Sequence, residues 1–170
     1  MVEDQISLRG LRPEDRPEIA RILGSTPAFR PEEVAIALEL VDETLDPNPS
    51  TDYEWIIAEL KENVVGFACF GPVPLTEGTF DLYWIAVAPG ASRLGIASRL
   101  DAAVTANVRT RPRARWLLAE TSSTPDYGPA RAFYGRRGYR LVGELPDYYR
   151  PGDDRLTFGK RLDGDSHVSD

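Results

Sequence analysis

The stretch of the chain best suited to chemistry runs from residue 82 to residue 97. Residues 82–89 are mostly apolar and indicate a strand, and a short loop leads from them into a helical pattern. The first amides of a helix have no intrahelical partner and the helix dipole attracts anions, so this junction suits a phosphate. Gly95 and the small Ala97 let the backbone approach such a group. An ordinary strand–turn–helix connection has the same pattern.

This junction lacks the motifs of the common nucleotide-binding domains. A Walker loop ends in Gly-Lys-Ser/Thr, which does not follow here, and the glycines do not have the spacing Gly-x-Gly-x-x-Gly. A nucleotide-binding α/β domain therefore lacks its phosphate motif, and a titration with ATP would test for one.

A metal site or a reactive thiol is not expected. The chain has one cysteine, Cys69, within the apolar run 64–70, where packing in the core is the simpler role. Its one histidine, His167, lies in a polar tail. Without clustered cysteine and histidine ligands, a zinc site is improbable.

Composition limits the classes of partner. The 170 residues suit one domain, and 42% of them are hydrophobic. The net charge of -7 argues against a nucleic-acid binder; it suits a cationic substrate such as an amine, although solubility is its commoner meaning. The acidic N-terminus and the lack of an apolar run of transmembrane length predict a cytoplasmic protein without membrane contact.

The elements that would position the junction can be read from periodicity and from proline and glycine. Helices are expected to begin near Pro13 and Pro31, because proline is tolerated in the first turn. A turn at Glu62-Asn63 is expected to join two strands as a hairpin. The predicted ranges up to the junction are a strand at 6–9, helices at 13–24 and 31–45, and strands at 54–61, 64–70 and 79–87.

The second half alternates helices and strands in the same way. The predicted ranges are a helix at 95–108, a strand at 116–119 that ends in Glu120, a helix at 129–137, and strands at 139–143 and 155–160. The order β-α-α-β-β-β-α-β-α-β-β predicts a mixed α/β fold, with a central sheet of about seven strands flanked by four helices. We expect one domain over residues 1–162 and a disordered polar tail at 163–170.

A second motif covers residues 130–139 and reads Ala-Arg-Ala-Phe-Tyr-Gly-Arg-Arg-Gly-Tyr. With the junction, it resembles the GNAT family of N-acetyltransferases. The family's cofactor motif has a strand ending in Val-x-x-Pro or similar, then Arg/Gln-x-x-Gly-x-Gly/Ala, and its second motif is Ala-x-x-Phe-Tyr-x-x-x-Gly-Phe. Two positions depart from the family: Ser92 replaces Arg/Gln, with Arg93 next to it, and Tyr127 replaces an asparagine.

The resemblance implies the GNAT acyl-CoA N-acyltransferase fold and acetyl-CoA as cosubstrate. It implies direct transfer to a neutral amine, with central strands that diverge near Ile85 to Val87 so that their backbone binds pantetheine. The pyrophosphate is expected at the amides of residues 93–98. The residues implied to bind the cofactor are Ile85, Ala86, Val87, Ser92, Arg93, Leu94, Gly95, Ile96, Ala97, Ser98, Ala130 and Phe133.

The resemblance also implies catalytic roles. Tyr134 occupies the position of the family tyrosine that protonates the leaving thiolate, although it and Phe133 also fit a core of aromatic side chains. Asp81 and Glu120 each occupy a position where some members carry the base that deprotonates the amine. We expect Glu120 to be the base and Asp81 to be able to bind the ammonium group. Both also fit solvated residues at strand ends.

The acceptor is less defined. Tyr83, and the pair Tyr148 and Tyr149 in the expected loop 147–154, are the candidate substrate-binding residues; the pair resembles that of peptide N-terminal acetyltransferases, and a turn with two packed aromatics fits equally well. The acceptor is expected to be an amine of a small molecule or a peptide N-terminus, and the chain a monomer or homodimer. The alternative function is a non-catalytic acyl-CoA-binding or interaction module, which would bind without turnover.

Overall fold

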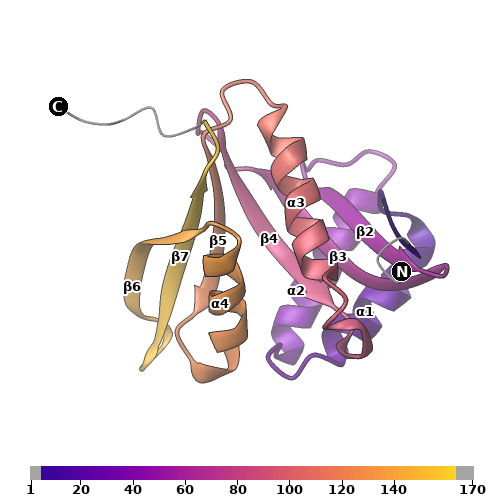
Figure 1. The fold of residues 1–170 in the computed structure, drawn as a ribbon, viewed down its shortest axis with the longest axis horizontal. Helices are drawn as coiled ribbons and strands as arrows, with labels where there is room; N and C mark the ends of the chain where they lie inside the picture. Colours follow the sequence, from indigo (N-terminus) through magenta and orange to yellow (C-terminus); the bar gives the residue numbers. More distant parts are fainter. Residues whose placement is uncertain (1–4, 164–170) are drawn as a thin grey trace. The chain divides into compact units, whose positions relative to one another are not determined.

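The structure, a computed structural model, describes residues 5–163 (Figure 1). Its helices and strands follow the order that the sequence predicts. The first half contains β1 (Ile6–Arg9), α1 (Arg16–Gly24), α2 (Pro31–Leu45), β2 (Glu54–Leu60), β3 (Asn63–Pro72) and β4 (Thr79–Val87). The second half contains α3 (Ile96–Arg109), β5 (Trp116–Ser122), α4 (Gly128–Arg136), β6 (Arg140–Arg150) and β7 (Asp153–Arg161).

The strands form one mixed sheet of seven strands in the order β1-β2-β3-β4-β5-β7-β6. Strands β1 to β3 are joined antiparallel, as are β5 with β7 and β7 with β6. Strand β4 runs parallel to β5, with Asp81 opposite Leu118. The prediction of a mixed sheet of about seven strands with four helices is therefore confirmed. No helix in residues 5–163 is long and apolar enough to cross a membrane.

These elements are distributed over two compact units. The first consists of the chain up to Gly71 together with Tyr83–Val104, and the second of Pro72–Leu82 together with the chain from Thr105 onward. The expectation of one domain over residues 1–162 stays a prediction. The predicted polar tail lies outside the described residues, apart from Asp163.

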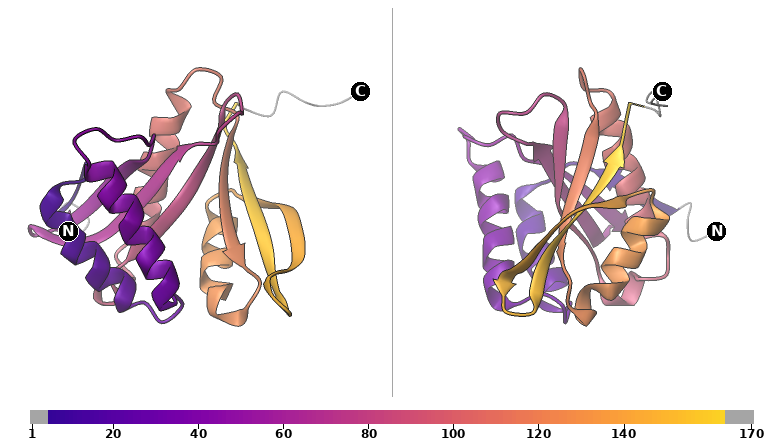
Figure 2. Two further views of the ribbon diagram at one scale, coloured as in Figure 1. Left: turned by 180° about the vertical axis from the view of Figure 1, so that it is seen from behind. Right: turned by 90° about the vertical axis from the view of Figure 1, so that its left-hand side faces the viewer.

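In the first unit, α1 and α2 cover one face of β2 and β3, and α3 covers the opposite face (Figures 1 and 2). Gly66 on β3 lies where β3, β4 and α3 approach one another closely. A side-chain carbon at this position would lie 3.0 Å from the carbonyl oxygen of Ala86 on β4 and 3.0 Å from Ile96 at the start of α3. Glycine therefore lets β3, β4 and the first turn of α3 meet. The largest fully buried side chains of this core are Phe67, Phe70, Ile19, Ile22, Leu23, Ile57, Ile96 and Leu100.

In the second unit, α4 lies against β5 and β7 (Figure 1). Tyr134 on α4 is 7% exposed, and its ring centroid lies 5.8 Å from that of Phe158 on β7 and 5.3 Å from that of Tyr139. Leu117 and Ala119 on β5 are also buried. Aromatic packing therefore fixes α4 to this part of the sheet.

Two predicted boundaries in the first half were wrong by a few residues. The hairpin turn lies at Lys61 and Glu62, whose φ angles are 50° and 64°, and Asn63 already belongs to β3. Two consecutive positive φ angles match the twist of the flanking strands. In addition, Pro13 starts a single 3-10 turn, and α1 begins only at Arg16.

Two boundaries in the second half change where candidate site residues lie. Glu120 does not end its strand, because Ser122 still pairs with Arg155 of β7. Tyr148 and Tyr149 lie on β6 rather than in a loop. The connection to β7 is short, because Gly152 has a φ angle of 79° and its amide donates a hydrogen bond to the Asp147 carboxylate at 2.6 Å.

Candidate active site

The loop predicted to bind the cofactor belongs to the first unit and connects β4 to α3. The amide of Ala88 donates to the carbonyl of Val65 at 2.8 Å, which holds the end of β4 to β3. Gly95 then turns the chain into the helix with a φ angle of 71°, a conformation that other residues rarely adopt. Its carbonyl accepts the amide of Arg99 at 3.1 Å. The loop is thus tied at both ends.

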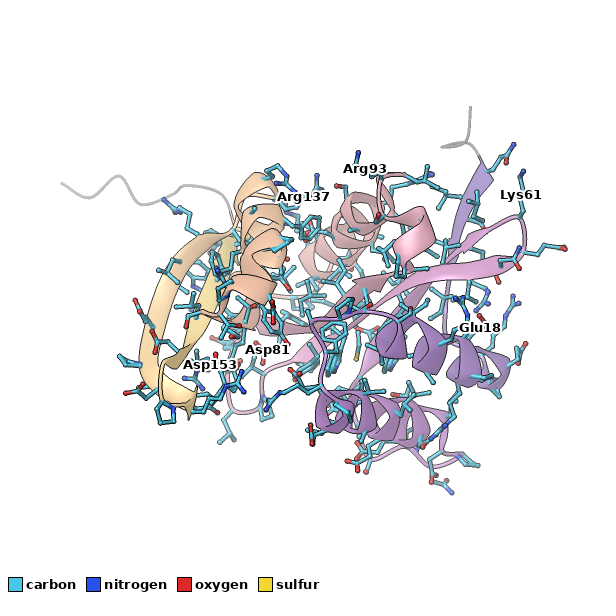
Figure 3. All side chains as sticks on the ribbon, turned by 90° about the horizontal axis from the view of Figure 1, so that it is seen from below. Glu18, Lys61, Asp81, Arg93, Arg137 and Asp153 are labelled. Atoms are coloured by element: carbon cyan, nitrogen blue, oxygen red, sulfur yellow. The ribbon has the colours of Figure 1, made fainter. Side chains whose placement is uncertain are left out.

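The start of α3 is suited to bind an anion. Helix geometry leaves the amides of Ile96, Ala97 and Ser98 without an intrahelical carbonyl, and the first turn carries no acidic side chain. Gly95 is exposed, and a side-chain carbon there would meet nothing within 4 Å. Arg93 is exposed at the same end of the helix (Figure 3). The backbone and this guanidinium can therefore receive a phosphate group.

The other predicted cofactor residues lie on regular elements. Ile85, Ala86 and Val87 form the last three residues of β4 in the first unit, where Ala86 is buried and its neighbours are half-buried. Ala130 and Phe133 are half-buried on α4 in the second unit. The predicted divergence of the central strands near Ile85 stays a prediction.

Asp81, whose side chain is labelled in Figure 3, lies in the second unit and has a carboxylate with a raised pKa. Burial raises its pKa to about 6, and the negative charge of Glu120 adds to the increase. Asp81 lies opposite Leu118 in the β4–β5 register, so alternation places Glu120 on the same face of the sheet. Among the described residues, no hydrogen bond or ion pair stabilises the Asp81 carboxylate.

Glu120 has a different environment. Its side chain is 48% exposed, and its Oε1 lies 3.7 Å from a terminal nitrogen of Arg155. The Arg155 guanidinium lies over the Tyr148 ring, 4.4 Å from the centroid. The Tyr148 and Tyr149 rings meet edge to face at 4.9 Å.

Tyr149 connects the aromatic pair to the acids electrostatically. Its pKa is raised, first by burial and then by the charge of Glu120. The hydroxyl group therefore stays protonated at neutral pH and can donate a hydrogen bond. Asp81, Glu120 and the pair Tyr148 and Tyr149 were predicted as site residues, and the structure brings them together with Arg155, which was not predicted. We call these five residues the acceptor cluster.

The sequence reasoning missed Arg155 and its neighbour Asp153. Asp153 is buried and accepts a hydrogen bond from the Ser122 hydroxyl at 2.5 Å, which joins the start of β7 to the end of β5. β7 pairs with β5 on one side and with β6 on the other, and this position brings Arg155 next to the other residues of the acceptor cluster. The alternating pattern of residues 155–160 predicted the strand but carried no signal for its neighbours.

Two predicted site tyrosines make packing contacts. The ring of Tyr134 lies in the aromatic group of α4 and β7 described above, as the alternative core role for this residue predicts. Tyr83 belongs to the first unit, where its ring meets that of Tyr53 edge to face at 5.2 Å. The predicted chemical roles of both residues stay predictions.

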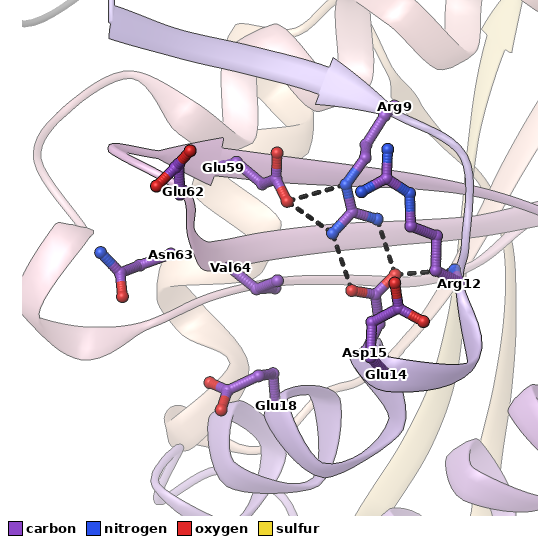
Figure 4. Close-up of a pocket in the computed structure, with 9 residues that line it drawn as sticks. All are labelled: Arg9, Arg12, Glu14, Asp15, Glu18, Glu59, Glu62, Asn63 and Val64. Atoms are coloured by element: carbon purple, nitrogen blue, oxygen red, sulfur yellow. Dashed lines mark hydrogen bonds and ion pairs between the residues drawn. The ribbon is translucent and has the colours of Figure 1, made fainter.

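A pocket of about 440 Å³ in the first unit is lined by none of these residues and lies between β1, the start of α1 and the β2–β3 turn (Figure 4). Arg9 lines this pocket and donates hydrogen bonds to Asp15 at 2.7 and 2.8 Å and to Glu59 at 2.7 Å. Burial acts to raise the pKa of Asp15, but the hydrogen bonds from Arg9 and from the Arg12 amide outweigh it and lower the pKa. The charges are paired with each other, so we assign this group to stability.

The chain is similar to known acetyltransferases in sequence and in fold. Residues 51–141 match the family described as the acetyltransferase (GNAT) domain. A structure from Desulfovibrio desulfuricans that is assigned to the GNAT family is 40% identical, with a TM-score of 0.88 over 92% of this chain and 99% of that chain. No curated protein matches the chain significantly.

More distant structures share the fold. The ribosomal-protein-S18-alanine N-acetyltransferase of Escherichia coli is 18% identical, with a TM-score of 0.72 over 96% of this chain and 99% of that chain. An aminoglycoside 6'-N-acetyltransferase complexed with coenzyme A is 16% identical, with a TM-score of 0.72 over 93% and 98%. With a family match over more than half of its length and a 40% identical relative, the chain belongs to the GNAT family of acetyltransferases.

Proposed function

We propose that the protein transfers an acetyl group from acetyl-CoA to a primary amine. The observation that carries this proposal is the family match over residues 51–141, which includes the start of α3, both candidate acids and Tyr134. Acetyl-CoA supplies the acetyl group as a thioester. The amides at the start of α3, with Arg93 beside them, would hold its pyrophosphate.

The structural relatives support an amine acceptor. One is named for the alanine of a ribosomal protein and another for an aminoglycoside, and the latter is complexed with coenzyme A. Acceptors of both kinds present a primary amine, on a peptide in one case and on a small molecule in the other. The half-buried carboxylate of Asp81 suits a primary amine, because an ammonium must lose a proton before it can attack a carbonyl carbon.

We assign the proton acceptor to Asp81, in contrast to the sequence-based preference for Glu120. A pKa of about 6 leaves Asp81 ionised at neutral pH, yet makes it a stronger base than an ordinary aspartate. Glu120 is more exposed and faces Arg155, so its charge is partly neutralised. In this assignment burial, with a smaller contribution from the charge of Glu120, holds the pKa of Asp81 high, and Asp81 takes the amine proton directly or through a water molecule.

The leaving thiolate needs a proton, and we assign its donor to the hydroxyl of Tyr134. The packing of its ring against Tyr139 and Phe158 fixes the direction of the side chain. A fixed hydroxyl suits a general acid, because proton transfer requires hydrogen-bond distance to the reacting atom.

The experiment that tests the function measures release of the free CoA thiol from acetyl-CoA with a panel of amines. We expect turnover with at least one primary amine and mass-spectrometric detection of its acetylated product. Binding of acetyl-CoA without turnover of any amine would instead support the non-catalytic acyl-CoA-binding module. Hydrolysis that is independent of the amine would contradict acetyl transfer.

A further inference from the structure

Arg155 is placed to bind a ligand, because its side chain donates no hydrogen bond to any of residues 5–163. Its side chain is 31% exposed, and its nearest carboxylate oxygen, on Glu120, is 3.7 Å away, beyond hydrogen-bond distance. Its Nε atom is buried and has no partner among the described residues. A guanidinium carries five donors, and leaving a buried donor unpaired is unfavourable. A ligand that accepts hydrogen bonds from this guanidinium would remove that cost.

Other arginines of this chain show what a structural arginine does. Arg16 makes two hydrogen bonds to Asp42, at 2.5 and 2.7 Å, and Arg131 donates to two backbone carbonyls at 2.7 and 2.9 Å. Arg161 is the closest match, because its guanidinium also lies over a ring, that of Trp116, at 4.9 Å. Yet Arg161 donates two hydrogen bonds to Asp163. Arg155 has the aromatic contact, but its carboxylate neighbour Glu120 lies 3.7 Å away, too far for a hydrogen bond.

The surroundings hold the Arg155 guanidinium in place. The Tyr148 ring covers one of its faces, and stacking leaves the donors free at the edge of the guanidinium plane. Residue 155 lies opposite Ser122 on β5 and Leu145 on β6, so its backbone is paired on both sides. A fixed guanidinium with free donors favours a planar anion, and the carboxylate is the anion whose geometry it matches.

We propose that Arg155 binds a carboxylate of the acceptor, so that the enzyme prefers amines that also carry a carboxylate. The inference rests on the proposed acetyl transfer and specifies its substrate class. Asp81 receives the amino group, and Arg155, in contact with Glu120 and Tyr148, receives the carboxylate. The cluster thus presents opposite charges to the two ends of a zwitterion.

The test compares acceptors with and without the carboxylate, and kcat/KM is expressed per neutral amine because the amide also lowers the pKa of the amino group. Phenylalanine is paired with phenylalaninamide, which keeps the amino group and the side chain. A second pair, the peptide amides Ala-Asp-NH₂ and Ala-Asn-NH₂, presents the carboxylate from a peptide side chain. These arms distinguish a free amino acid from a peptide as its source. We expect the wild-type enzyme to have a higher kcat/KM for the carboxylate member of at least one pair.

The variants are Arg155→Gln and Arg155→Lys, with Arg161→Gln as the matched control. Arg155→Gln is expected to lower kcat/KM for the carboxylate acceptor by roughly 10- to 100-fold, mainly through KM, as for the loss of a hydrogen bond to a charged group. The amide acceptor should change by less than about threefold. Arg155→Lys should retain part of the preference, since lysine keeps the charge but not the fork. Arg161→Gln should change neither ratio.

Equal losses for both members of the preferred pair in Arg155→Gln would show that Arg155 only supports the fold of the cluster and would overturn the proposal. A wild-type enzyme that prefers the carboxylate member of neither pair would overturn it too, while leaving acetyl transfer intact. Binding of phenylalanine to the CoA complex, measured by calorimetry, separates the remaining case. Binding that needs Arg155 but yields no acetylated product would support the carboxylate site and contradict acetyl transfer.

Discussion

The carboxylate of Asp81 is held half-buried beside a second acid, and this environment defines a pH dependence. As the proposed base, Asp81 works only in its ionised form, so kcat/KM should fall as the pH drops through about 6. An acceptor amine with its own pKa below about 5 removes the titration of the substrate from the profile. We expect the acidic limb near pH 6 to disappear in Asp81→Asn, together with a loss of rate of about 10²–10⁴-fold.

Glu120→Gln is the informative companion of that measurement. It removes the charge that helps raise the pKa of Asp81, so the acidic limb should move to lower pH while the rate at pH 8 is nearly kept. If Glu120→Gln abolishes the rate at pH 8 and Asp81→Asn does not, the two roles are exchanged.

Tyr134 combines a packing role and a proposed chemical role, and these can be separated. Tyr134→Phe keeps the ring among Tyr139 and Phe158 and removes only the hydroxyl, so the aromatic packing of α4 should be kept and the variant should fold. If the hydroxyl protonates the leaving thiolate, turnover should fall by about 10²–10⁴-fold at unchanged affinity for acetyl-CoA. Normal turnover in this variant would leave Tyr134 a packing residue only.

At the scale of elements, the start of α3 is the part whose role is easiest to isolate. Acetyl-CoA at a hundredfold excess over its Kd should stabilise the protein by about 2.7 kcal/mol, visible as a rise in Tm. Gly95→Glu should abolish this rise, because it places a carboxylate beside the amides that face the phosphates and also strains a backbone with φ of 71°.

Gly152→Glu is the control variant for the effect of backbone strain alone. Gly152 has a φ angle of 79° and open space around it, like Gly95, but it lies in the β6–β7 turn. This variant should lose stability and keep the full rise in Tm with acetyl-CoA. A full rise in Gly95→Glu would show that the cofactor binds elsewhere.

A second element-scale prediction concerns the connection between β1 and α1. Asp15 is buried and accepts two hydrogen bonds from Arg9, whereas the pair of Arg16 and Asp42 is exposed. Asp15→Asn leaves the Arg9 charge buried without this partner, so it should cost about 3 kcal/mol of unfolding free energy in urea titrations at pH 7. Asp42→Asn should cost less than about 1 kcal/mol.

The pH dependence of the unfolding free energy tests whether Asp15 stabilises the protein in its ionised form. The pKa of Asp15 is lowered in the folded protein, so its contribution is present above its ordinary pKa of 3.8 and is lost as the pH falls through the lowered value. The difference between wild type and Asp15→Asn should therefore shrink as the pH is lowered progressively below 3.8. A difference that stays the same down to the acid unfolding of the protein would contradict an ionic role.

Elements were predictable where local chemistry determines them. Pro31 and Gly138 mark the start of α2 and the end of α4, and both motifs of the site lie on the predicted strand, loop and helices. The end of β6 was not predictable, since its pairing reaches Arg150 through a turn whose geometry depends on Asp147 and Gly152. Arg155 was missed for a related reason: its neighbours come from strand pairing, which is non-local.

The whole molecule carries a net charge of -7, and this field acts differently on the acceptors compared above. A negative protein attracts a cationic amine over a distance set by the Debye length, which falls from about 30 Å at 0.01 M salt to about 8 Å at 0.15 M. A zwitterion has no net charge and is attracted only at short range, within the acceptor cluster.

Salt should therefore separate the two kinds of acceptor. For phenylalaninamide, which is partly cationic near neutral pH, kcat/KM should fall by about threefold or more between 0.01 and 0.15 M potassium chloride. For phenylalanine it should change by less than about twofold, because its amino and carboxylate charges experience nearly equal and opposite long-range forces. The measurement is a steady-state titration of each acceptor at saturating acetyl-CoA, so that the salt dependence of cofactor binding does not enter; the bound phosphates add to the negative field of the protein. Equal salt dependence for both acceptors would show that the net charge of the protein does not act on the acceptor.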